Sequence, residues 1–324
     1  MRAVVFTDYG TADDLELREV ARPELEADEV LVRIHATSVN PYDWHLLTGL
    51  PYFSRLQMGL RKPKVTCLGA DVAGTVESVG RSVTRFAAGD EVFGGVERAG
   101  GFAEYTAVPE AGLAKKPPNL TFEQAAAVTM GALTALQGLR DHGGVRSGMH
   151  VLINGASGGV GTFAVQIAKH LGAEVTGVCS TRNVELVRSL GADHVIDYTQ
   201  GDFTEVDSAF DLMLDNVGNR GIRACLGALK PQGVYVANFG QPDNRWTGPL
   251  LQLGRSLLLS MVVSQKVKVF VSKGTVEDME LLRDLLSTGE LTSVIDKTYP
   301  LEQAAEAMRY LEAGHARGKV LVAV

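Results

Sequence analysis

The sequence predicts an α/β protein in which a small β-rich domain accompanies a doubly wound parallel sheet. Three observations predict this fold. Short strand-like runs separated by Gly, Pro and Asp fill the first third of the chain. After Gly148, predicted strands and helices alternate regularly, and a glycine-rich turn joins the first of these strands to its helix. A chain of 324 residues is long enough for about two domains.

The β-rich first third is expected to form a compact, barrel-like domain. Its predicted strands cover residues 3–6, 30–36, 71–79 and 103–108. Glycines gather between Gly89 and Gly101, which indicates a region of turns before the last of these strands.

The α/β part begins with a helix that is capped by Thr121 and runs to about Leu139. The predicted strands that follow cover residues 151–153, 174–178, 194–196, 211–215 and 233–237, and the helices between them cover 160–171, 184–190 and 222–229. The tail is predicted to contain helices at 276–287 and 301–313 and a last strand at 319–322. Alternation of this kind is typical of a parallel, doubly wound sheet.

Composition and charge exclude several classes of protein. The chain is 45% hydrophobic and 21% charged, as expected of a globular protein. A net charge of -7 argues against a nucleic-acid partner, because binding a phosphate backbone requires clustered Lys and Arg. The three cysteines, Cys67, Cys179 and Cys225, are far apart, which excludes a four-Cys zinc site and argues against a disulfide framework.

Neither a signal peptide nor a membrane span is expected. The apolar start of the chain turns polar at Thr7 and Asp8. The most apolar stretch, residues 250–263, is short and is interrupted by Gln252 and Arg255. The chain is therefore predicted to be cytoplasmic.

The sharpest motif is the turn Asn-Gly-Ala-Ser-Gly-Gly-Val-Gly at residues 154–161. Glycines let backbone N–H groups approach a pyrophosphate, and the helix that follows points its positive end at the phosphates. The alternative is a tight strand-to-helix connection that binds nothing, but the flanking elements match a dinucleotide fingerprint. No Gly-Lys-Ser/Thr follows, which excludes a Walker A loop. The motif predicts a dinucleotide site formed by Ala156, Ser157, Gly158, Gly159, Val160 and Gly161.

Several segments together make the chain similar to a known family. They are SVNPYD at residues 38–43, LGADVAG at 68–74, GDEV at 89–92, the glycine turn, CSTRN at 179–183, LGAD at 190–193 and GHARGK at 314–319. In this order, over essentially the whole chain, they resemble the quinone oxidoreductase branch of the medium-chain dehydrogenase/reductase superfamily. The resemblance implies a GroES-like catalytic domain of residues 1–122 and 269–324 and a Rossmann domain of residues 123–268, with the cofactor in the cleft between them.

The resemblance also implies a reaction without zinc. In the zinc alcohol dehydrogenases of this superfamily, a Cys and a Gly-His-Glu sequence hold the metal, and the corresponding positions here are Asn40 and Gly69-Ala70-Asp71. Asn and Ala are poor zinc ligands. Without a metal to stabilise an alkoxide, the easier hydride acceptor is a quinone or an α,β-unsaturated carbonyl compound. An NADPH-dependent aldehyde or ketone reductase and a slow-turnover NADPH-binding regulatory protein remain alternatives.

Four residues of the first domain are candidates for catalysis. Asn40 has the family position beside the nicotinamide, where its amide is available to the acceptor oxygen, or it satisfies the turn before Pro41. Asp43 either orients the site or forms hydrogen bonds within the turn. His45 is a candidate proton donor, because histidine ionises near neutral pH, or it lines the cleft wall. Tyr52 is displaced by one position from the family pattern and is a weaker candidate.

The end of the second predicted strand of the α/β part favours NADPH over NADH. No acid occurs between Cys179 and Glu185, whereas NAD enzymes place a carboxylate there for the ribose hydroxyls. Ser180 and Arg182 can bind the 2′-phosphate instead, although Arg182 could also be a solvated charge at a helix start. The resemblance and the strand ends add Thr134, Tyr198, Asn216, Val217, Phe239, Gly240, Arg317 and Lys319 as cofactor contacts.

A homodimer is predicted from residues 262–271. Apolar residues alternate there with Ser264, Lys266 and Lys268, which suits an edge strand with one buried face. An exposed edge invites pairing with a second copy of the chain, and the resemblance implies the same arrangement.

Overall fold

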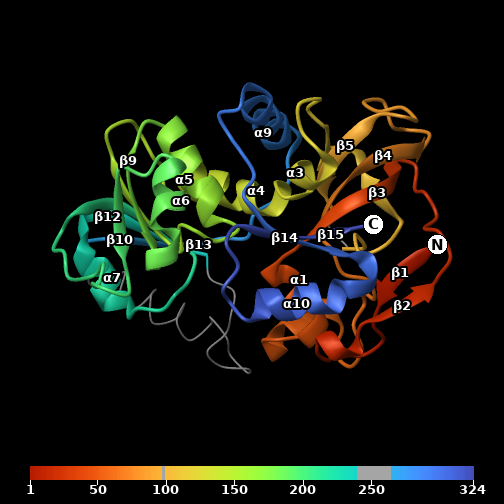
Figure 1. Ribbon diagram of the computed structural model, residues 1–324, viewed down its shortest axis with the longest axis horizontal. Helices are drawn as coiled ribbons and strands as arrows, with labels where there is room; N and C mark the ends of the chain where they lie inside the picture. Colours follow the sequence, from red (N-terminus) through yellow and green to blue (C-terminus); the bar gives the residue numbers. More distant parts are fainter. Residues whose placement is uncertain (97–98, 239–263) are drawn as a thin grey trace. The chain divides into compact units, whose positions relative to one another are not determined.

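The computed structural model describes residues 1–96, 99–238 and 264–324. They form two compact units, which we call unit 1 (residues 1–130 and 273–324) and unit 2 (residues 131–238 and 264–272). Both ends of the chain lie in unit 1 (Figure 1). The C-terminal segment therefore completes the unit that the N-terminal segment begins.

Seven strands of the described chain form the sheet of unit 1. Their order is β14-β15-β3-β4-β5-β7, and β6 also pairs with β3. Their bounds are β3 Glu29–Val39, β4 Asp71–Val79, β5 Glu91–Gly95, β6 Tyr105–Pro109, β7 Leu113–Lys115, β14 Ile295–Pro300 and β15 Lys319–Ala323. Val30, Val32 and Ile34 of β3 are buried in one core with residues of β4 and β5. A separate antiparallel pair is formed by β1 (Arg2–Val5) and β2 (Glu16–Glu19).

The register of this sheet brings distant parts of the chain together. Ser38 near the end of β3 lies opposite Asp71 at the start of β4. On its other side, Val39 lies opposite Val320 near the start of β15. The last residues of β3 and the first residues of β4 and β15 therefore meet at one place.

Unit 2 contains a sheet of six parallel strands among the described residues, in the order β10-β9-β8-β11-β12-β13. The strands are β8 His150–Asn154, β9 Glu174–Cys179, β10 His194–Asp197, β11 Phe210–Asp215, β12 Leu229–Ala237 and β13 Lys266–Val269, and helices α5 Gly161–His170, α6 Val184–Ser189 and α7 Ile222–Ala228 connect them. The strand order reverses between β8 and β11. In open sheets of this kind ligands bind beside the carboxyl ends of the strands at that reversal.

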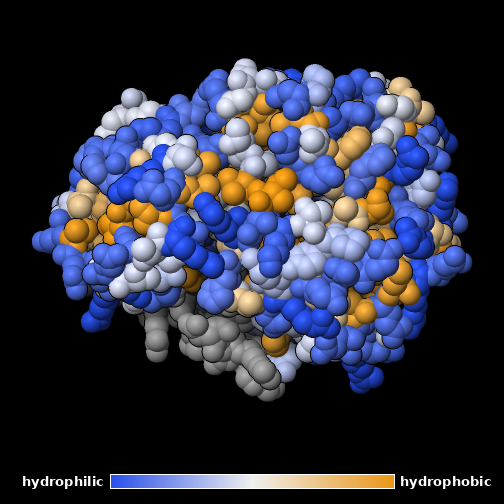
Figure 2. Space-filling model, viewed as in Figure 1, coloured by the Kyte–Doolittle hydropathy of each residue, from blue (hydrophilic) through white to orange (hydrophobic). Residues whose placement is uncertain are grey.

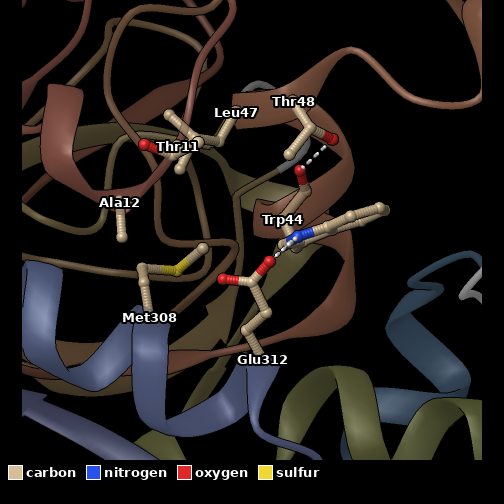
Figure 3. A pocket seen from close by; sticks show the side chains of 7 residues that line it. All are labelled: Thr11, Ala12, Trp44, Leu47, Thr48, Met308 and Glu312. Carbon is tan, nitrogen blue, oxygen red and sulfur yellow. Dashed lines mark hydrogen bonds between the residues drawn. The ribbon is translucent and has the colours of Figure 1, made fainter.

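Helices of unit 1 cover its sheet and its N-terminal segment. Helix α3 (Phe122–Ala126) contacts β3 and β4, α9 (Val276–Thr288) contacts β7, and α1 (Pro41–Thr48) contacts α10 (Ala304–Glu312). Between α1 and α10 the indole N–H of Trp44 donates to Glu312 at 3.2 Å (Figure 3). The small pocket there is lined by Thr11, Ala12, Trp44, Leu47, Thr48, Met308 and Glu312 and has about 20 Å³ of space. That is room for about one water molecule.

The structure departs from the predicted elements at two informative places. Residues 121–139 form α3 and then α4 (Thr129–Gln137) instead of one helix. In the first turn of α4 the N–H of Met130 donates to the Asp71 carboxylate at 2.9 Å, so a side chain far away in sequence caps a new helix start. No helix was predicted at residues 41–48, and a turn before Pro41 was one of the two interpretations of Asn40. Pro41 at the first position of α1 and Asp43, which accepts the N–H of Asn40, start a helix instead.

One face of the molecule shows how polar and apolar side chains are distributed. On the face seen in Figure 2, charged and polar side chains predominate, and apolar side chains form several groups among them. Within the described ranges, no helix combines the length and the apolar character that crossing a membrane requires. The apolar stretch at residues 250–263 lies outside the described residues.

Candidate nucleotide site and buried polar cluster

The glycine turn of unit 2 connects β8 to α5 as predicted. Gly155 has a φ of 77°, in the left-handed region that favours glycine. A Cβ on Gly161 would lie 2.0 Å from the carbonyl oxygen of Gly155, so this position requires glycine. Gly158 has only that same carbonyl oxygen within 4 Å of its Cβ position, at 3.4 Å. The turn therefore has no room for a side chain at Gly161, where α5 begins, but has open space beside Gly158. No side chain caps the first turn of α5, so its N–H groups suit a phosphate.

A buried carboxylate supports the turn from the neighbouring strand β11. One oxygen of Asp215 accepts from the amide of Asn154 (2.9 Å) and from the backbone N–H groups of Val217 (3.0 Å) and Gly218 (2.9 Å). The other oxygen accepts from the hydroxyl of Tyr235 (2.7 Å). Burial, reinforced by this carboxylate, raises the pKa of Tyr235 above its usual range, so the tyrosine stays a donor. The sequence analysis did not identify Asp215 or Tyr235.

The turn after β11 lies directly beside the glycine turn. The N–H of Asn216 donates to the carbonyl oxygen of Asn154 at 3.2 Å. A Cβ at Gly155 would lie 2.7 Å from a methyl group of Val217. Asn216 also accepts from the amide of Asn238 at 3.0 Å. The predicted contacts Asn216 and Val217 thus lie at the carboxyl end of β11, beside the carboxyl end of β8.

The end of β9 is tied to the glycine turn by a residue that the sequence analysis did not single out. The amide of Asn183 donates to the hydroxyl of Ser157 (3.0 Å) and to that of Ser180 (3.2 Å). Its own side-chain oxygen is buried and has no partner among the described residues. Ser157 in the turn and Ser180 after the strand are therefore held as one unit. In the sequence, the available signal was an asparagine directly before the helix α6. Its burial and its partners are seen only in the structure.

Arg182 and Tyr198 lie on the surface near this strand end. Arg182 is exposed in the short helical turn Thr181–Asn183, and Tyr198 directly follows β10. The hydroxyl of Thr181 donates to Asp197 at 2.6 Å and holds the pKa of that exposed carboxyl below its usual range. A carboxylate is thus present at the end of β10, although none occurs at the end of β9.

The remaining predicted cofactor contacts lie in different surroundings. In unit 2, the hydroxyl of Thr134 is within 3.0 Å of that of Ser272. In unit 1, the backbone N–H of Arg317 donates to Asp296 at 2.9 Å. Phe239 and Gly240 lie outside the described residues. Lys319 lies in the interior of unit 1.

A group of polar side chains, which we call the buried polar cluster, lies where β3, β4, α1 and β15 meet. Its members are Ser38, Asn40, Asp43, Asp71 and Lys319, each no more than 3% exposed. Polar groups are buried at this density only where they satisfy one another. The cluster contains two predicted catalytic residues, Asn40 and Asp43, and the predicted cofactor contact Lys319.

Asp71 is the centre of the cluster. One of its oxygens accepts from the hydroxyl of Ser38 (2.6 Å), the amide of Asn40 (3.1 Å) and the ammonium of Lys319 (3.3 Å). The other oxygen accepts from the N–H of Met130 (2.9 Å). The carboxylate accepts from four donors, so these contacts make Asp71 a residue that holds the cluster together.

The carboxamide of Asn40 is held mainly through its oxygen. Lys319 donates to that oxygen at 2.5 Å. The amide nitrogen makes longer contacts, to Asp71 at 3.1 Å and to the hydroxyl and carbonyl oxygens of Ser38 at 3.2 and 3.3 Å. The predicted donation from Asn40 to an acceptor oxygen stays a prediction, and it requires one of these long contacts to be exchanged.

Asp43 accepts one hydrogen bond within its turn and one from a distant loop, and its role in orienting the site stays a prediction. One oxygen accepts the N–H of Asn40 (2.8 Å) and the other accepts the N–H of Gly69 (2.7 Å). The carboxyl therefore links the start of α1 to the loop before β4. Burial raises the pKa of Asp43 to about 7, although the two N–H groups act in the opposite direction.

Stability should depend on pH through Asp43. An unfolded aspartate ionises near pH 4, so between about pH 4 and 7 the folded state retains a proton that the unfolded state has lost. The free energy of unfolding therefore falls as pH rises through this window. Relative to Asp43→Asn, the wild type should lose about 2 kcal/mol between pH 5 and pH 7, measured by urea unfolding. The exposed Asp8 allows a control, Asp8→Asn, which should follow the wild type. Parallel curves for wild type and Asp43→Asn would contradict the assignment.

The other two catalytic candidates lie on or after α1. Nδ1 of His45 is 2.7 Å from the carbonyl oxygen of Leu50. A carbonyl can only accept, so Nδ1 carries the hydrogen, and in the neutral ring Nε2 is an acceptor. Tyr52 lies in the short helical turn Tyr52–Ser54, with the guanidinium of Arg55 4.8 Å from its ring centre. Neither residue belongs to the buried polar cluster.

Two family models match parts of this chain. The model of the alcohol dehydrogenase GroES-like domain matches residues 26–118, and the model of the zinc-binding dehydrogenase matches residues 190–322. The first confirms the predicted GroES-like fold of the N-terminal part. The parallel sheet of unit 2 confirms the predicted Rossmann-like fold.

Relatives extend over the whole chain. The chain is 36% identical to the 2-methylene-furan-3-one reductase of Solanum lycopersicum, over 99% of this chain and 79% of the relative. It is 33% identical to the chloroplastic NADPH-dependent alkenal/one oxidoreductase of Arabidopsis thaliana, with the same coverage. Among solved structures, the Escherichia coli quinone oxidoreductase complexed with NADPH superposes with a TM-score of 0.86 at 26% identity, covering 100% of both chains.

Proposed function

The chain belongs to the medium-chain dehydrogenase/reductase superfamily, among its quinone oxidoreductases and enone reductases, and on that premise we propose that it is a zinc-independent, NADPH-dependent reductase of quinones or α,β-unsaturated carbonyl compounds. When bound, the reduced nicotinamide supplies the hydride. The acceptor oxygen then takes up negative charge and a proton. The residues of this chain bind the cofactor and supply groups that can stabilise that charge.

The open glycine turn carries this proposal. Its room at Gly158 and the uncapped start of α5 suit a pyrophosphate. Asn183 aligns Ser180 with Ser157 of the turn, at a strand end that has no carboxylate. Hydroxyl and guanidinium groups at this place favour a 2′-phosphate, which a carboxylate would repel. We therefore propose NADPH, held by residues 156–161, Ser180 and Arg182.

Steady-state oxidation of NADPH against a panel of acceptors tests the proposed function. We expect turnover with naphthoquinones or enones and little with simple aldehydes and ketones. Turnover confined to aldehydes or ketones would favour a carbonyl reductase. Oxidation that stops at one equivalent per protein would favour a regulatory binding protein.

Zinc independence is supported by the chemistry of the buried polar cluster. Asn40 stands where zinc enzymes of the superfamily place a ligand Cys, and Ala70 stands where they place a ligand His. The Lys319 ammonium already contacts Asn40 and the neighbouring Asp71. A zinc ion bound there would lie beside a buried positive charge, which is strongly unfavourable. Among the side chains that the structure describes, no group of His, Cys, Asp and Glu is arranged to hold a metal ion.

Purified protein should therefore contain far less than one zinc per chain and keep its full rate after dialysis against a chelator. Elemental analysis and the NADPH oxidation rate before and after chelation measure this. One tightly held zinc per chain, with activity lost on its removal, would refute the proposal.

His45 is proposed as the proton donor, with a condition that its geometry imposes. Because Nδ1 carries a hydrogen for Leu50, the ring can donate from Nε2 only as the imidazolium. The rate should then fall as pH rises through the ionisation of His45, and His45→Phe should remove this step from the profile of kcat/KM against pH. His170→Phe, at an exposed position of unit 2, is the control. If the profile of His45→Phe keeps the step, water is the donor.

We also propose a homodimer and a cytoplasmic location. Among the described residues, strand β13 is an edge of the sheet of unit 2. Its last residue, Val269, is 51% exposed, and Val271 just beyond it is 86% exposed. An exposed apolar edge suits pairing with a second copy, and light scattering at micromolar protein tests it by mass. The location stays a prediction, and the Arabidopsis relative is named chloroplastic.

A further inference from the structure

We propose that Lys319 is a positioning residue, whose buried ammonium fixes the orientation in which the carboxamide of Asn40 takes part in the reaction. This inference rests on the proposed function, because it concerns the same site. It is an alternative to the expectation that Lys319 contacts the cofactor.

The backbone places Lys319 rigidly at the start of β15. Its N–H donates to the carbonyl oxygen of Val294 at 2.8 Å. The preceding residue, Gly318, has a φ of 90°, and a Cβ there would lie 2.3 Å from that same oxygen. Only glycine fits this close approach. The chain therefore enters β15 in one conformation, and the Lys319 side chain is 3% exposed.

The buried ammonium of Lys319 requires acceptors, and the distances show which acceptor it lies closer to. Removing such a charge from water costs several kcal/mol unless it is paired and hydrogen-bonded. Lys319 lies 3.3 Å from the Asp71 carboxylate but 2.5 Å from the oxygen of Asn40. A lysine that served only to neutralise Asp71 would lie closer to the carboxylate than to a neutral amide. The shortest contact of the ammonium is to Asn40.

Charges on both sides determine which way the carboxamide points. Its oxygen faces the Lys319 ammonium and its nitrogen faces Asp71. Turning the group over would place the NH₂ against the ammonium and the oxygen against the carboxylate, and both contacts would be repulsive. The N–H hydrogens of Asn40 are therefore kept on one side. They make only contacts of 3.1 Å or more, which an oxyanion can replace.

A double-mutant cycle tests the proposal. Lys319→Met keeps the length of the side chain and removes its charge. We expect it to lower kcat by about tenfold or more, while the Kd for NADPH changes by less than about twofold. In the Asn40→Ala background the same substitution should change kcat by less than about twofold, because the group that it positions is absent. Lys297→Met, at an exposed lysine of β14, is the matched control and should leave kcat and Kd unchanged.

A second readout does not depend on turnover. The side-chain amide signals of Asn40 in a ¹⁵N spectrum can be assigned by their loss in Asn40→Ala. We expect slow hydrogen exchange in the wild type and in Lys297→Met, and exchange faster by about tenfold or more in Lys319→Met, because the amide is then free to turn. If the wild type reduces none of the acceptors, the proposed function fails while this measurement still decides the role of Lys319.

Three outcomes would overturn the proposal: additive losses in kcat, an unchanged amide signal in Lys319→Met, or an unchanged kcat with a Kd for NADPH raised about tenfold. The last would make Lys319 a cofactor contact. Should Lys319→Met not fold because Asp71 is left uncompensated, Asp71→Asn/Lys319→Met removes both charges. A kcat for that variant equal to that of Asp71→Asn would equally refute the role of Lys319.

Discussion

Asn40→Ala should lower kcat about 100-fold while the KM for NADPH changes by less than about twofold. Loss of one oxyanion donor typically costs a factor of about 100 or more, and that cost falls on turnover because the charge develops only in the transition state. Asn40 is suited to this role because its oxygen is held at 2.5 Å, whereas its N–H groups make longer contacts. Steady-state kinetics with the best acceptor of the panel measure both constants.

The control for this substitution is an exposed asparagine of unit 1 outside the buried polar cluster. Asn119 donates to the carbonyl oxygen of Leu286 at 3.2 Å. Asn119→Ala removes the same atoms away from the buried polar cluster and should affect unfolding, not kcat. If Asn40→Ala is folded and turns over at the wild-type rate, Asn40 is a structural residue and the acceptor charge is stabilised elsewhere.

Local patterns predicted much of the fold. Strand β4 was predicted with its observed bounds, residues 71–79, because its apolar run is bounded by residues that end strands. The glycine turn was predicted because its chemistry is local: glycine spacing, a strand before it and a helix after it. Helix α1 was not predicted, although Asn, Pro and Asp43 at this spacing are typical of a helix start.

The hydrogen bonds that hold the buried polar cluster and the glycine turn in place could not be predicted from the sequence. Lys319 and Asn40 are 279 positions apart, and Asp215 and Asn154 are 61 apart. No periodicity or motif relates such pairs, because only the order of the strands brings them together. The resemblance assigned Lys319 to the cofactor, which stays a prediction, and gave no sign of its contacts with Asn40 and Asp71. Asn183 was read as part of a motif, and its bridge between Ser157 and Ser180 appears only in the structure.

Arg182→Ala should raise the KM for NADPH by about tenfold or more and leave NADH kinetics nearly unchanged. Arg182 is exposed in the turn that follows β9, next to Ser180, at a strand end without a carboxylate. A hydrogen bond to a charged group contributes about 1.5–3 kcal/mol, which corresponds to a factor of about 10 to 100 in binding. NADH has no 2′-phosphate, so it has no such contact to lose.

Arg188→Ala is the matched control for charge. Arg188 lies on α6 of the same unit, is exposed, and pairs with Glu185 at 2.9 Å. Its removal lowers the net charge of the protein equally, so a general electrostatic effect would appear in both variants. We expect the KM for NADPH to change only in Arg182→Ala, with a weaker salt dependence there than in the wild type because one ion pair with the phosphate is lost. Equal effects on NADPH and NADH, equal effects of both substitutions, or a wild type that prefers NADH would show that the end of β9 does not select the phosphate.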